Sequence, residues 1–491
     1  MLAGAPVRLH AALSPRRVAT TALGLGFFLL VGIAVGRGGS AYVGAAAAMA
    51  MGLALALTNW RWSVRALLVY LPFSGIPIIL LYPNTAAPVL LKDFLFVIPA
   101  YVGFLVGCIA DRRSVAFPGA PTVLFALLAL LVVFQALNPA LPNVLVGAIG
   151  VKVWLLYMPL YYLGYHYLRS KDDLFRLFGL MSLVALVPAV IGILEALLVS
   201  NGKSALVYSF YGDAAAATTQ EFAQFNLESG GSIRRVSSTF SFVTQYYIFT
   251  AAMGAVAYAW WRGALAGTRR ASMGRAVWLT MIAAAFLSGA RGAFLLIPLL
   301  VVLMTLIEHG RVRLSPSRLV APAAALLAAV AVFGSGAWHI LSFAVEVGRQ
   351  EFADVFVNGF RSAFDLTLVG LGTGADTNAA RYAFSEPTLF SAVNGKWYES
   401  WYVKASLELG VAGLVLALLL LGTIVVRSWH SHRRLHDPRL RVVSASLIAL
   451  LVWNLVYNVK GQYTDLDPMN VYFWLFAGML AKLPQLDREE S

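Results

Sequence analysis

Apolar runs of roughly 15 to 25 residues alternate with short polar segments along the chain. A helix of this length crosses the ~30 Å hydrocarbon core of a bilayer, because each residue adds ~1.5 Å. The pattern therefore predicts an all-α polytopic membrane protein with about fourteen transmembrane helices. The predicted spans are 18–35, 41–57, 65–82, 93–110, 120–137, 151–168, 176–198, 238–261, 276–289, 292–307, 319–343, 401–426, 442–459 and 471–483.

Two long polar segments interrupt this pattern, at 199–237 and 344–400. Loops longer than about 15 residues in a compact protein are usually functional or disordered. Both segments are predicted to lie on the outer side, and the second reads as a folded loop. The resulting divisions are the N-terminal helices 1–198, an outer loop 199–237, the central helices 238–343, a large outer loop 344–400 and the C-terminal helices 401–491.

Composition supports the membrane assignment: 60% of the residues are hydrophobic, 12% are charged, and the mean hydropathy is +0.76. The one cysteine, Cys108, excludes a disulfide framework and a cysteine metal site. The chain starts with the basic residues Arg8, Arg16 and Arg17 and turns apolar at Val18. More spans follow, so we expect this start to be a first transmembrane helix rather than a removed signal peptide.

The net charge of +14 follows the predicted topology. With a cytoplasmic N-terminus, the inner connections carry about +16, and the outer loops together with the spans carry about −2. This distribution is the positive-inside rule, so the basic excess needs no nucleic-acid partner, and contact with anionic lipid is enough. Both termini are predicted to be cytoplasmic.

The segment 276–307 is too long for one span and has basic clusters at both ends. Since both clusters belong inside, the segment must turn back on the outer side, at the sequence SGARGA. This hairpin places Arg291 at or just below the outer surface.

Four segments deliver a charged side chain to the same outer face: Arg234 and Arg235, Arg291, Arg361, and Glu399. Charges at or in a membrane are costly and tend to be functional. The planar fork of arginine suits a phosphate, and several arginines suit a diphosphate. No HExxH motif or clear acidic pair predicts a metal site, and arginines can supply the charge neutralisation that a metal supplies elsewhere.

Structural explanations compete with these assignments. Arg234 and Arg235 could extend outward at the interface, and Arg361 could pair with Asp365 four residues on. Glu399 could be an acid favoured by the N-terminal end of a helix. Structural ion pairs are the favoured reading for four further residues in or near spans: Lys152, Glu195, Lys404 and Glu408.

Four short motifs carry a family resemblance. RRVSSTFSF is similar to an Arg-x-x-Gly-Thr-Phe segment that opens a span, and SGARGAFL is similar to a Ser-Arg-Gly-Ala turn. Arg361 and Gly372 stand at an arginine–glycine spacing, and ESWYVKASLELGVAG resembles the motif His-[Asn/Ser/Gln]-nine residues-Gly-x-x-Gly at Ser400, Gly410 and Gly413. The four motifs and their order along the chain carry the resemblance. Through them the C-terminal two thirds of the chain resembles the superfamily of O-antigen ligases and Wzy-type polymerases of bacterial envelopes.

The resemblance implies a metal-independent, inverting membrane glycosyltransferase with a GT-C-like fold and no cofactor. It implies a bacterial inner-membrane protein that acts at the periplasmic face on a glycan donor linked to undecaprenyl diphosphate and on a glycan acceptor. A chain-length regulator and a flippase are candidate partners. Chemical reasoning and the resemblance together assign Glu399 and Arg291 to catalysis; the expected substrate-binding residues are Arg234, Arg235, Arg361, Gly372 and Ser400.

The expected function is polymerisation of lipid-linked repeat units into O-antigen, capsule or exopolysaccharide. The ligases use a histidine where this chain has Glu399, whereas that position varies in the polymerases. An O-antigen ligase, which transfers glycan to lipid A-core, and a protein O-oligosaccharyltransferase are alternatives within the superfamily. A flippase for lipid-linked oligosaccharide and a non-catalytic scaffold are alternatives of other classes. The sugars, the linkage and the oligomeric state stay open.

Overall fold

The computed structural model describes residues 41–83, 86–212, 224–226, 232–264, 267–309, 345, 349, 352–377 and 399–489. The predicted spans 18–35 and 319–343 lie outside these residues, as do parts of both predicted loops. The described chain is mostly helical. Its two short strands, β1 (Gln224–Asn226) and β2 (Ser232–Arg234), pair antiparallel. The expectation of a helical architecture is thus confirmed for the described residues.

The chain divides into two compact units, of which the first comprises Met1–Leu67 and Leu90–Ser114. The helices that contribute to it are α2 (Ala41–Tyr70), α4 (Ala86–Lys92), η2 (Asp93–Val97) and α5 (Ile98–Ala110). A Cβ on Gly103 would lie 2.3 Å from the carbonyl oxygen of Ala56, so α2 and α5 approach closely only because Gly103 lacks a side chain. Trp60 packs edge-on against Phe104 in the same contact, with ring centroids 5.1 Å apart.

The sequence predicts two spans, 41–57 and 65–82, and the structure has a helix break between them but does not continue the second span unbroken. α2 continues from Ala41 to Tyr70 with a local break at Asn59, where φ is −162° and ψ is 91°. Two shorter elements follow, η1 (Leu71–Phe73) and α3 (Gly75–Leu80). The second predicted helix therefore begins inside α2 and is interrupted soon after Tyr70. Pro72 stands at this interruption, and proline lacks the N–H that would continue a helical ladder.

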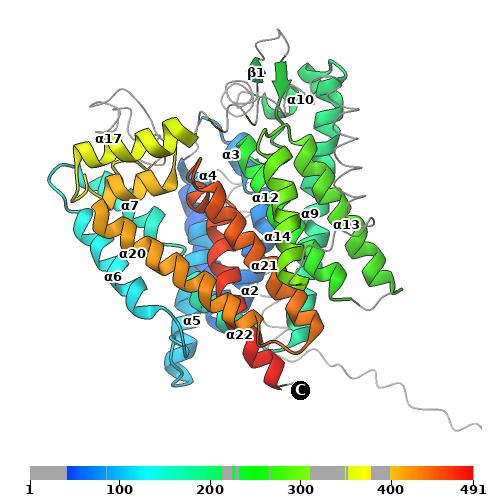
Figure 1. The fold of residues 1–491 in the computed structure, drawn as a ribbon, viewed down its shortest axis with the longest axis horizontal. Coiled ribbons are helices and arrows are strands. Elements are labelled where there is room, and N and C mark those ends of the chain that lie inside the picture. Colours follow the sequence, from blue (N-terminus) through cyan, green and yellow to red (C-terminus); the bar gives the residue numbers. More distant parts are fainter. Residues whose placement is uncertain are drawn as a thin grey trace, which may run out of the picture. The chain divides into compact units, whose positions relative to one another are not determined.

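The second unit, Leu68–Val89 and Val115–Ser491, holds the remaining helices (Figure 1). They are α6 (Thr122–Gln135), α7 (Val144–Leu155), α8 (Leu160–Tyr167), α9 (Lys171–Ser200), α10 (Ser204–Tyr211), α12 (Val243–Arg262), α13 (Arg269–Leu287), α14 (Ala293–His309), η5 (Phe352–Asn358), α17 (Gly359–Leu366), α20 (Trp401–His432), α21 (Pro438–Tyr457), η6 (Tyr463–Asp465) and α22 (Met469–Glu489). Every span predicted in this unit within the described residues falls on one or two of these helices.

Five helical segments of the described chain are long and apolar enough to cross a bilayer. They are Pro88–Ala110, Val144–Tyr167, Lys171–Ser200, Trp401–His432 and Pro438–Tyr457. Two apolar helices, Thr122–Gln135 and Ala293–His309, are shorter. A chain with several helices of this kind is typical of a membrane protein.

The core of the second unit is formed by helices that are buried on all sides. In α12 nearly every residue from Val243 to Trp260 is buried, and the same holds for α22 from Met469 to Leu480. α22 packs against α8 through two glycines. A Cβ on Gly164 would lie 2.1 Å from the Leu475 carbonyl oxygen, and one on Gly478 would lie 1.9 Å from the Tyr161 carbonyl oxygen. Small residues permit this close backbone contact.

The long helix α20 is broken at Gly410, which has a φ of +71°. A buried loop lies against the break and exchanges backbone hydrogen bonds with it. Leu371 N donates to Leu407 O at 2.7 Å, Gly372 N donates to Glu408 O at 3.2 Å, and Val411 N donates to Leu368 O at 3.0 Å. The loop thus gives partners to backbone groups that the break would otherwise leave exposed within an apolar helix. Figure 1 shows α17, which leads into this loop, running alongside the first part of α20.

The glycine contact between α8 and α22 gives a first prediction. We expect Gly478→Ala to destabilise the protein by about 1–3 kcal/mol, because the new methyl group would overlap the Tyr161 carbonyl and push the helices apart. Unfolding of the purified protein in detergent measures this effect. Gly422→Ala in α20 is the matched control, since a Cβ there meets nothing within 4 Å, and should leave stability unchanged or slightly raised. Equal stability of the two variants would contradict the contact.

Candidate functional site

Two of the segments singled out by sequence lie against each other: the residues after β2 and the turn between α13 and α14. Val236 N donates to Ser288 O at 3.1 Å. Gly289 has a φ of +74°, and a Cβ there would lie 2.7 Å from the Arg234 carbonyl oxygen. Both the backbone conformation and the lack of space require glycine at this position. The contact brings Arg235 and Arg291 into the same region.

The start of α20 and the loop after α21 complete the site. Trp401 N donates to the carbonyl oxygens of Asn458 and Gly461 at 3.1 and 3.2 Å. The buried Ser400 directs its hydroxyl to Asn458 O at 3.4 Å. These bonds fix the position of Glu399, which immediately precedes them and has an exposed side chain.

Two stacked tyrosines from this loop face the arginines. The rings of Tyr457 and Tyr463 are 3.7 Å apart between centroids, with an interplanar angle of 17°. The Tyr457 hydroxyl lies beside the hairpin, 3.6 Å from the position of a Cβ on Gly292. Burial raises the pKa of Tyr463, and the nearby Tyr457 and Glu399 raise it further. Its hydroxyl therefore stays protonated at neutral pH and can act as a hydrogen-bond donor.

The electrostatics of Arg235 show that these groups form one cluster. Burial lowers the pKa of Arg235 to about 10, with Arg291 as the second cause, while Tyr457, Tyr463 and Glu399 oppose the shift. Arg235 is still protonated at pH 7. Two guanidinium groups and one carboxylate thus share a partly buried region, which we call the arginine cluster: Arg235, Arg291, Glu399, Tyr457 and Tyr463. With a formal charge of +1, it is suited to bind an anion.

The neighbouring Arg234 points elsewhere. Its guanidinium lies 5.9 Å from the ring centroid of Tyr208 on α10. Of the two adjacent arginines predicted as substrate ligands, Arg235 is therefore the one that joins Arg291 and Glu399. The Arg-x-x-Gly-Thr-Phe spacing, with Thr239 and Phe240 at its end, also falls on Arg235. Adjacent residues in an extended segment face opposite sides, so Arg234 faces away.

The segment that carries Arg235 is fixed by a buried polar group on α9. Glu195 accepts a hydrogen bond from the Tyr211 hydroxyl at 2.6 Å and another from Ser238 N at 2.8 Å. Ser238 itself has a left-handed backbone, with φ of +52°, and its hydroxyl donates to Pro188 O at 2.6 Å. Glu195, expected as half of an ion pair, instead holds this strained turn by hydrogen bonds.

Two predicted substrate residues lie apart from the arginine cluster. Arg361 has an exposed side chain on α17, and within the described residues it makes no ion pair with Asp365. α17 docks on α20 through Ala363, which packs with Val403 and Leu407. Gly372 lies in the loop at the α20 break, where its N–H donates a hydrogen bond to the carbonyl oxygen of Glu408. Its φ of +108° and the nearby Leu141 side chain require glycine, so its evident role is in the fold of this loop.

The structure also reveals polar partners that the sequence did not single out. Lys404 pairs with Asp465 at 2.5 Å, and Glu408 accepts hydrogen bonds from Trp154 and from the 376–377 segment. The ammonium of Lys152 lies 5.7 Å from the centroid of the Tyr157 ring. The tyrosines and Asp465 come from the loop 457–467, which the sequence presents only as a short polar connection. Its clustering of Tyr, Asn, Gln and Asp between two spans was the available signal.

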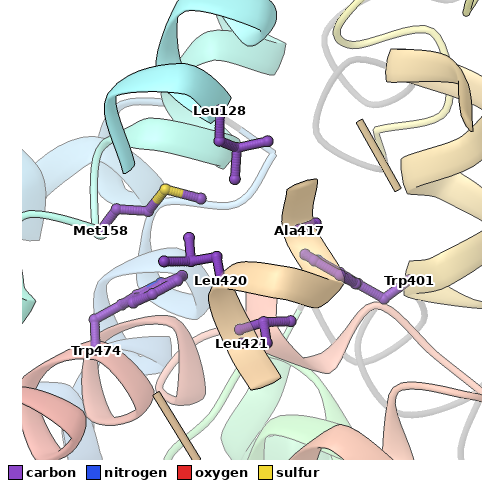
Figure 2. Close-up of a pocket in the computed structure, with 7 residues that line it drawn as sticks. All are labelled: Leu128, Met158, Trp401, Ala417, Leu420, Leu421 and Trp474. Carbon is purple, nitrogen blue, oxygen red and sulfur yellow. The ribbon is translucent and has the colours of Figure 1, made fainter. Parts of the chain in front are cut away.

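An apolar pocket lies next to the start of α20 (Figure 2). Its lining residues come from α6, α20, α22 and the turn before α8: Leu128, Met158, Trp401, Ala417, Leu420, Leu421 and Trp474. Trp401 also donates through its indole Nε1 to Asp465 at 3.0 Å. The pocket offers no polar atoms and so contributes hydrophobic contact, not chemistry.

Neither the other side chains nor known proteins add a further assignment. Among the residues that the structure describes, no group of three or more His, Cys, Asp or Glu side chains is placed to hold a metal ion. Comparison with family models and with curated proteins finds no match. The functional argument therefore depends on the arginine cluster and on the motifs that supply its residues.

The pKa of Arg235 predicts how anion binding depends on pH. Sulfate keeps its charge from pH 7 to 11, so its stabilisation of the purified full chain against heat reports the charge of the site. We expect a constant stabilisation from pH 7 to 9 and a decrease as pH rises through about 10, where Arg235 loses its proton. Arg235→Lys should shift the decrease to lower pH, because lysine starts from a lower pKa.

Two variants test whether this anion effect belongs to the cluster. Arg291→Ala should abolish the sulfate effect, because it removes one of the two guanidinium groups. The control Arg434→Ala, at an exposed position after α20, should keep it. A sulfate effect of normal size in Arg291→Ala would show that the anion binds elsewhere.

Proposed function

We propose that this chain is a membrane glycosyltransferase that polymerises undecaprenyl-diphosphate-linked repeat units into a bacterial surface polysaccharide. The observation that carries the proposal is the meeting of Arg235, Arg291 and Glu399, which come from three distant parts of the sequence. In this proposal the protein lies in the inner membrane with both termini cytoplasmic, and the arginine cluster faces the periplasm.

The positive charge of the arginine cluster complements the negative charge of the leaving group in the proposed reaction. Breaking a glycosyl–diphosphate bond places negative charge on the departing diphosphate, and preorganised cations stabilise that charge in the transition state. Arg235 and Arg291 supply two guanidinium groups, and burial together with the repulsion from Arg291 lowers the pKa of Arg235. A bound diphosphate relieves this repulsion. The cluster therefore favours a doubly charged leaving group over a neutral one.

Glu399 has the properties of a general base in this reaction. Its side chain is exposed and close to Tyr463 and Arg235, so a sugar hydroxyl can approach it from outside the helices. In the proposed step the hydroxyl oxygen forms a bond to the anomeric carbon while the carbon–diphosphate bond breaks. The electron pair leaves with the diphosphate oxygen, and the hydroxyl proton moves to Glu399. A single displacement of this kind inverts the anomeric configuration.

Backbone conformations at the motif positions support the resemblance that points to this family. Ser238 stands where the Arg-x-x-Gly-Thr-Phe motif has glycine, and it adopts a φ of +52°, which glycine adopts without strain. Gly410 has a φ of +71°, and a Cβ on Gly413 would lie 2.0 Å from the Cβ of Leu409. The motif glycines thus have physical reasons in this chain, which short chance matches would not be expected to have.

The superfamily alternatives share the donor and differ in the acceptor. A ligase would use the same arginines to release the diphosphate and would present the glycan to lipid A-core. A protein O-oligosaccharyltransferase would present it to a polypeptide hydroxyl. Nothing in the arginine cluster distinguishes the three acceptors, and the absence of the ligase histidine at Glu399 favours the polymerase.

The flippase alternative gains support from one observation. α20 is interrupted at Gly410 beside the buried Lys404 and Glu408, and interrupted helices with buried charges are common in transporters. In this structure the interruption is filled by the backbone of 368–377. The two functions are separated by the compartment in which repeat units accumulate when the gene is deleted.

Deletion of the gene tests the proposed function directly. We expect single repeat units on undecaprenyl diphosphate, accessible from the periplasm, in place of long chains, as measured by gels of membrane glycans. Long chains that accumulate on the lipid diphosphate without reaching the core lipid would indicate the ligase instead. Repeat units that stay on the cytoplasmic side would contradict an enzyme and indicate a flippase.

Variants expressed in the deletion strain test the assigned roles. Glu399→Gln should lower the polymerisation rate by about 10²–10⁴-fold, because the amide cannot accept the proton. Arg291→Ala should lower it by about 10²–10³-fold through lost charge stabilisation. Arg434→Ala, which is remote from the cluster, is the control for expression. Full activity of Glu399→Gln would exclude Glu399 as the base.

A further inference from the structure

A buried ion pair fixes the loop that carries the two tyrosines of the arginine cluster. Lys404 is fully buried on the second turn of α20, and its Nζ lies 2.5 Å from Asp465 Oδ2. The same ammonium lies 4.8 Å from the centroid of the Trp154 ring. Because an unpaired charge in such surroundings is strongly unfavourable, separation of Lys404 from Asp465 is disfavoured and the loop stays attached to α20.

The attachment extends from Asp465 toward Tyr463. Asp465 Oδ1 also accepts a hydrogen bond from Trp401 Nε1 at 3.0 Å, so each oxygen of the Asp465 carboxylate has a partner. Next to it, the Thr464 hydroxyl accepts from the side-chain amides of Asn454 and Asn458 at 2.7 and 2.6 Å. Tyr463 precedes these two anchored residues directly. The backbone that carries Tyr463 is therefore fixed by contacts made outside the arginine cluster, in addition to the stacking of its ring on Tyr457.

One helical turn further along α20, Glu408 fixes the second loop. Its Oε1 accepts from Asp376 N and from the Thr377 hydroxyl, both at 2.9 Å. Its Oε2 accepts from Trp154 Nε1 at 2.6 Å. Gln462 then joins the two loops, since its Nε2 donates to the Asp376 carbonyl at 3.2 Å.

Lys404 and Glu408, four residues apart on α20, thus hold the loops 457–467 and 367–377 against one helix. We infer that both are positioning residues, which set the placement of Tyr463 and Glu399 relative to Arg235 and Arg291. They do so through Asp465 and through the fixed start of α20, without contact to substrate. The consequence for catalysis rests on the proposed function, whereas the anchoring of the loops does not.

The experiment compares removal of one charge with removal of the pair. Lys404→Met leaves the partly buried Asp465 carboxylate without its cationic partner, and it should lower both the melting temperature and the activity of the purified full chain. Lys404→Met/Asp465→Leu removes both charges, and it should recover most of the melting temperature. Its kcat for transfer from a lipid-diphosphate-linked repeat unit should stay about tenfold or more below that of the wild type, with a nearly unchanged KM. A role in stability alone predicts that kcat recovers with the melting temperature.

Hydrogen exchange supplies a readout that needs no substrate. In the double variant, amides of the 457–467 peptide should exchange faster, while those of α12 should not change. The matched control is Arg113→Met/Asp111→Leu, which removes an exposed ion pair and should alter neither exchange nor kcat. Unchanged exchange at 457–467, or a wild-type kcat in the double variant, would overturn the inference. Wild-type protein without transfer activity would reject the proposed function, and the exchange result would still decide the anchoring.

Discussion

Burial of charge in an apolar helical bundle is the constraint on which this structure depends. Several buried or partly buried ionic groups join chain segments that are far apart in sequence: Glu195 joins α9 to the segment after β2, and Lys404 joins α20 to the loop after α21. Glu408 does the same between α7, α20 and the 376–377 segment. Since water cannot reach these groups, the loops that satisfy them have little freedom to rearrange. The polar contacts therefore fix loop positions that apolar packing would leave unspecified.

The arginine cluster brings like charges together. Arg235 and Arg291 both belong to it, and the nearby Glu399 carboxylate partly compensates their charge. Like charges in a partly buried region cost stability, which is typical of binding sites. An anionic ligand offsets this cost, so the repulsion between the two arginines favours anion binding.

The sequence predicted the helices well and the site in part, for identifiable reasons. Apolar periodicity located the helices of the second unit, and charge bias located the hairpin with Arg291. The motif spacing that places glycine at Ser238 also selects Arg235 over Arg234, whose guanidinium lies near Tyr208 in the structure. Tyr457, Tyr463 and Asp465 were missed because their roles arise from contacts with segments far away in the sequence, such as the 61 residues between Lys404 and Asp465. The predicted connection between spans 41–57 and 65–82 contains the break at Asn59 in α2, whereas the interruption after Tyr70 was not predicted.

The left-handed backbone of Ser238 links this position to the residues that stabilise it. A non-glycine residue in the left-handed region costs ~1–2 kcal/mol, and here the Pro188 carbonyl and the Glu195 carboxylate offset that cost through hydrogen bonds. The Pro188 carbonyl belongs to the main chain and is present with any residue at 188, whereas the carboxylate is specific to Glu195. Loss of that carboxylate is therefore more damaging with a strained serine at position 238 than it would be with glycine there. Positions 195 and 238 are thus coupled, and the turn that positions Arg235 is a point of epistasis at which the order of mutations decides which sequences are accessible.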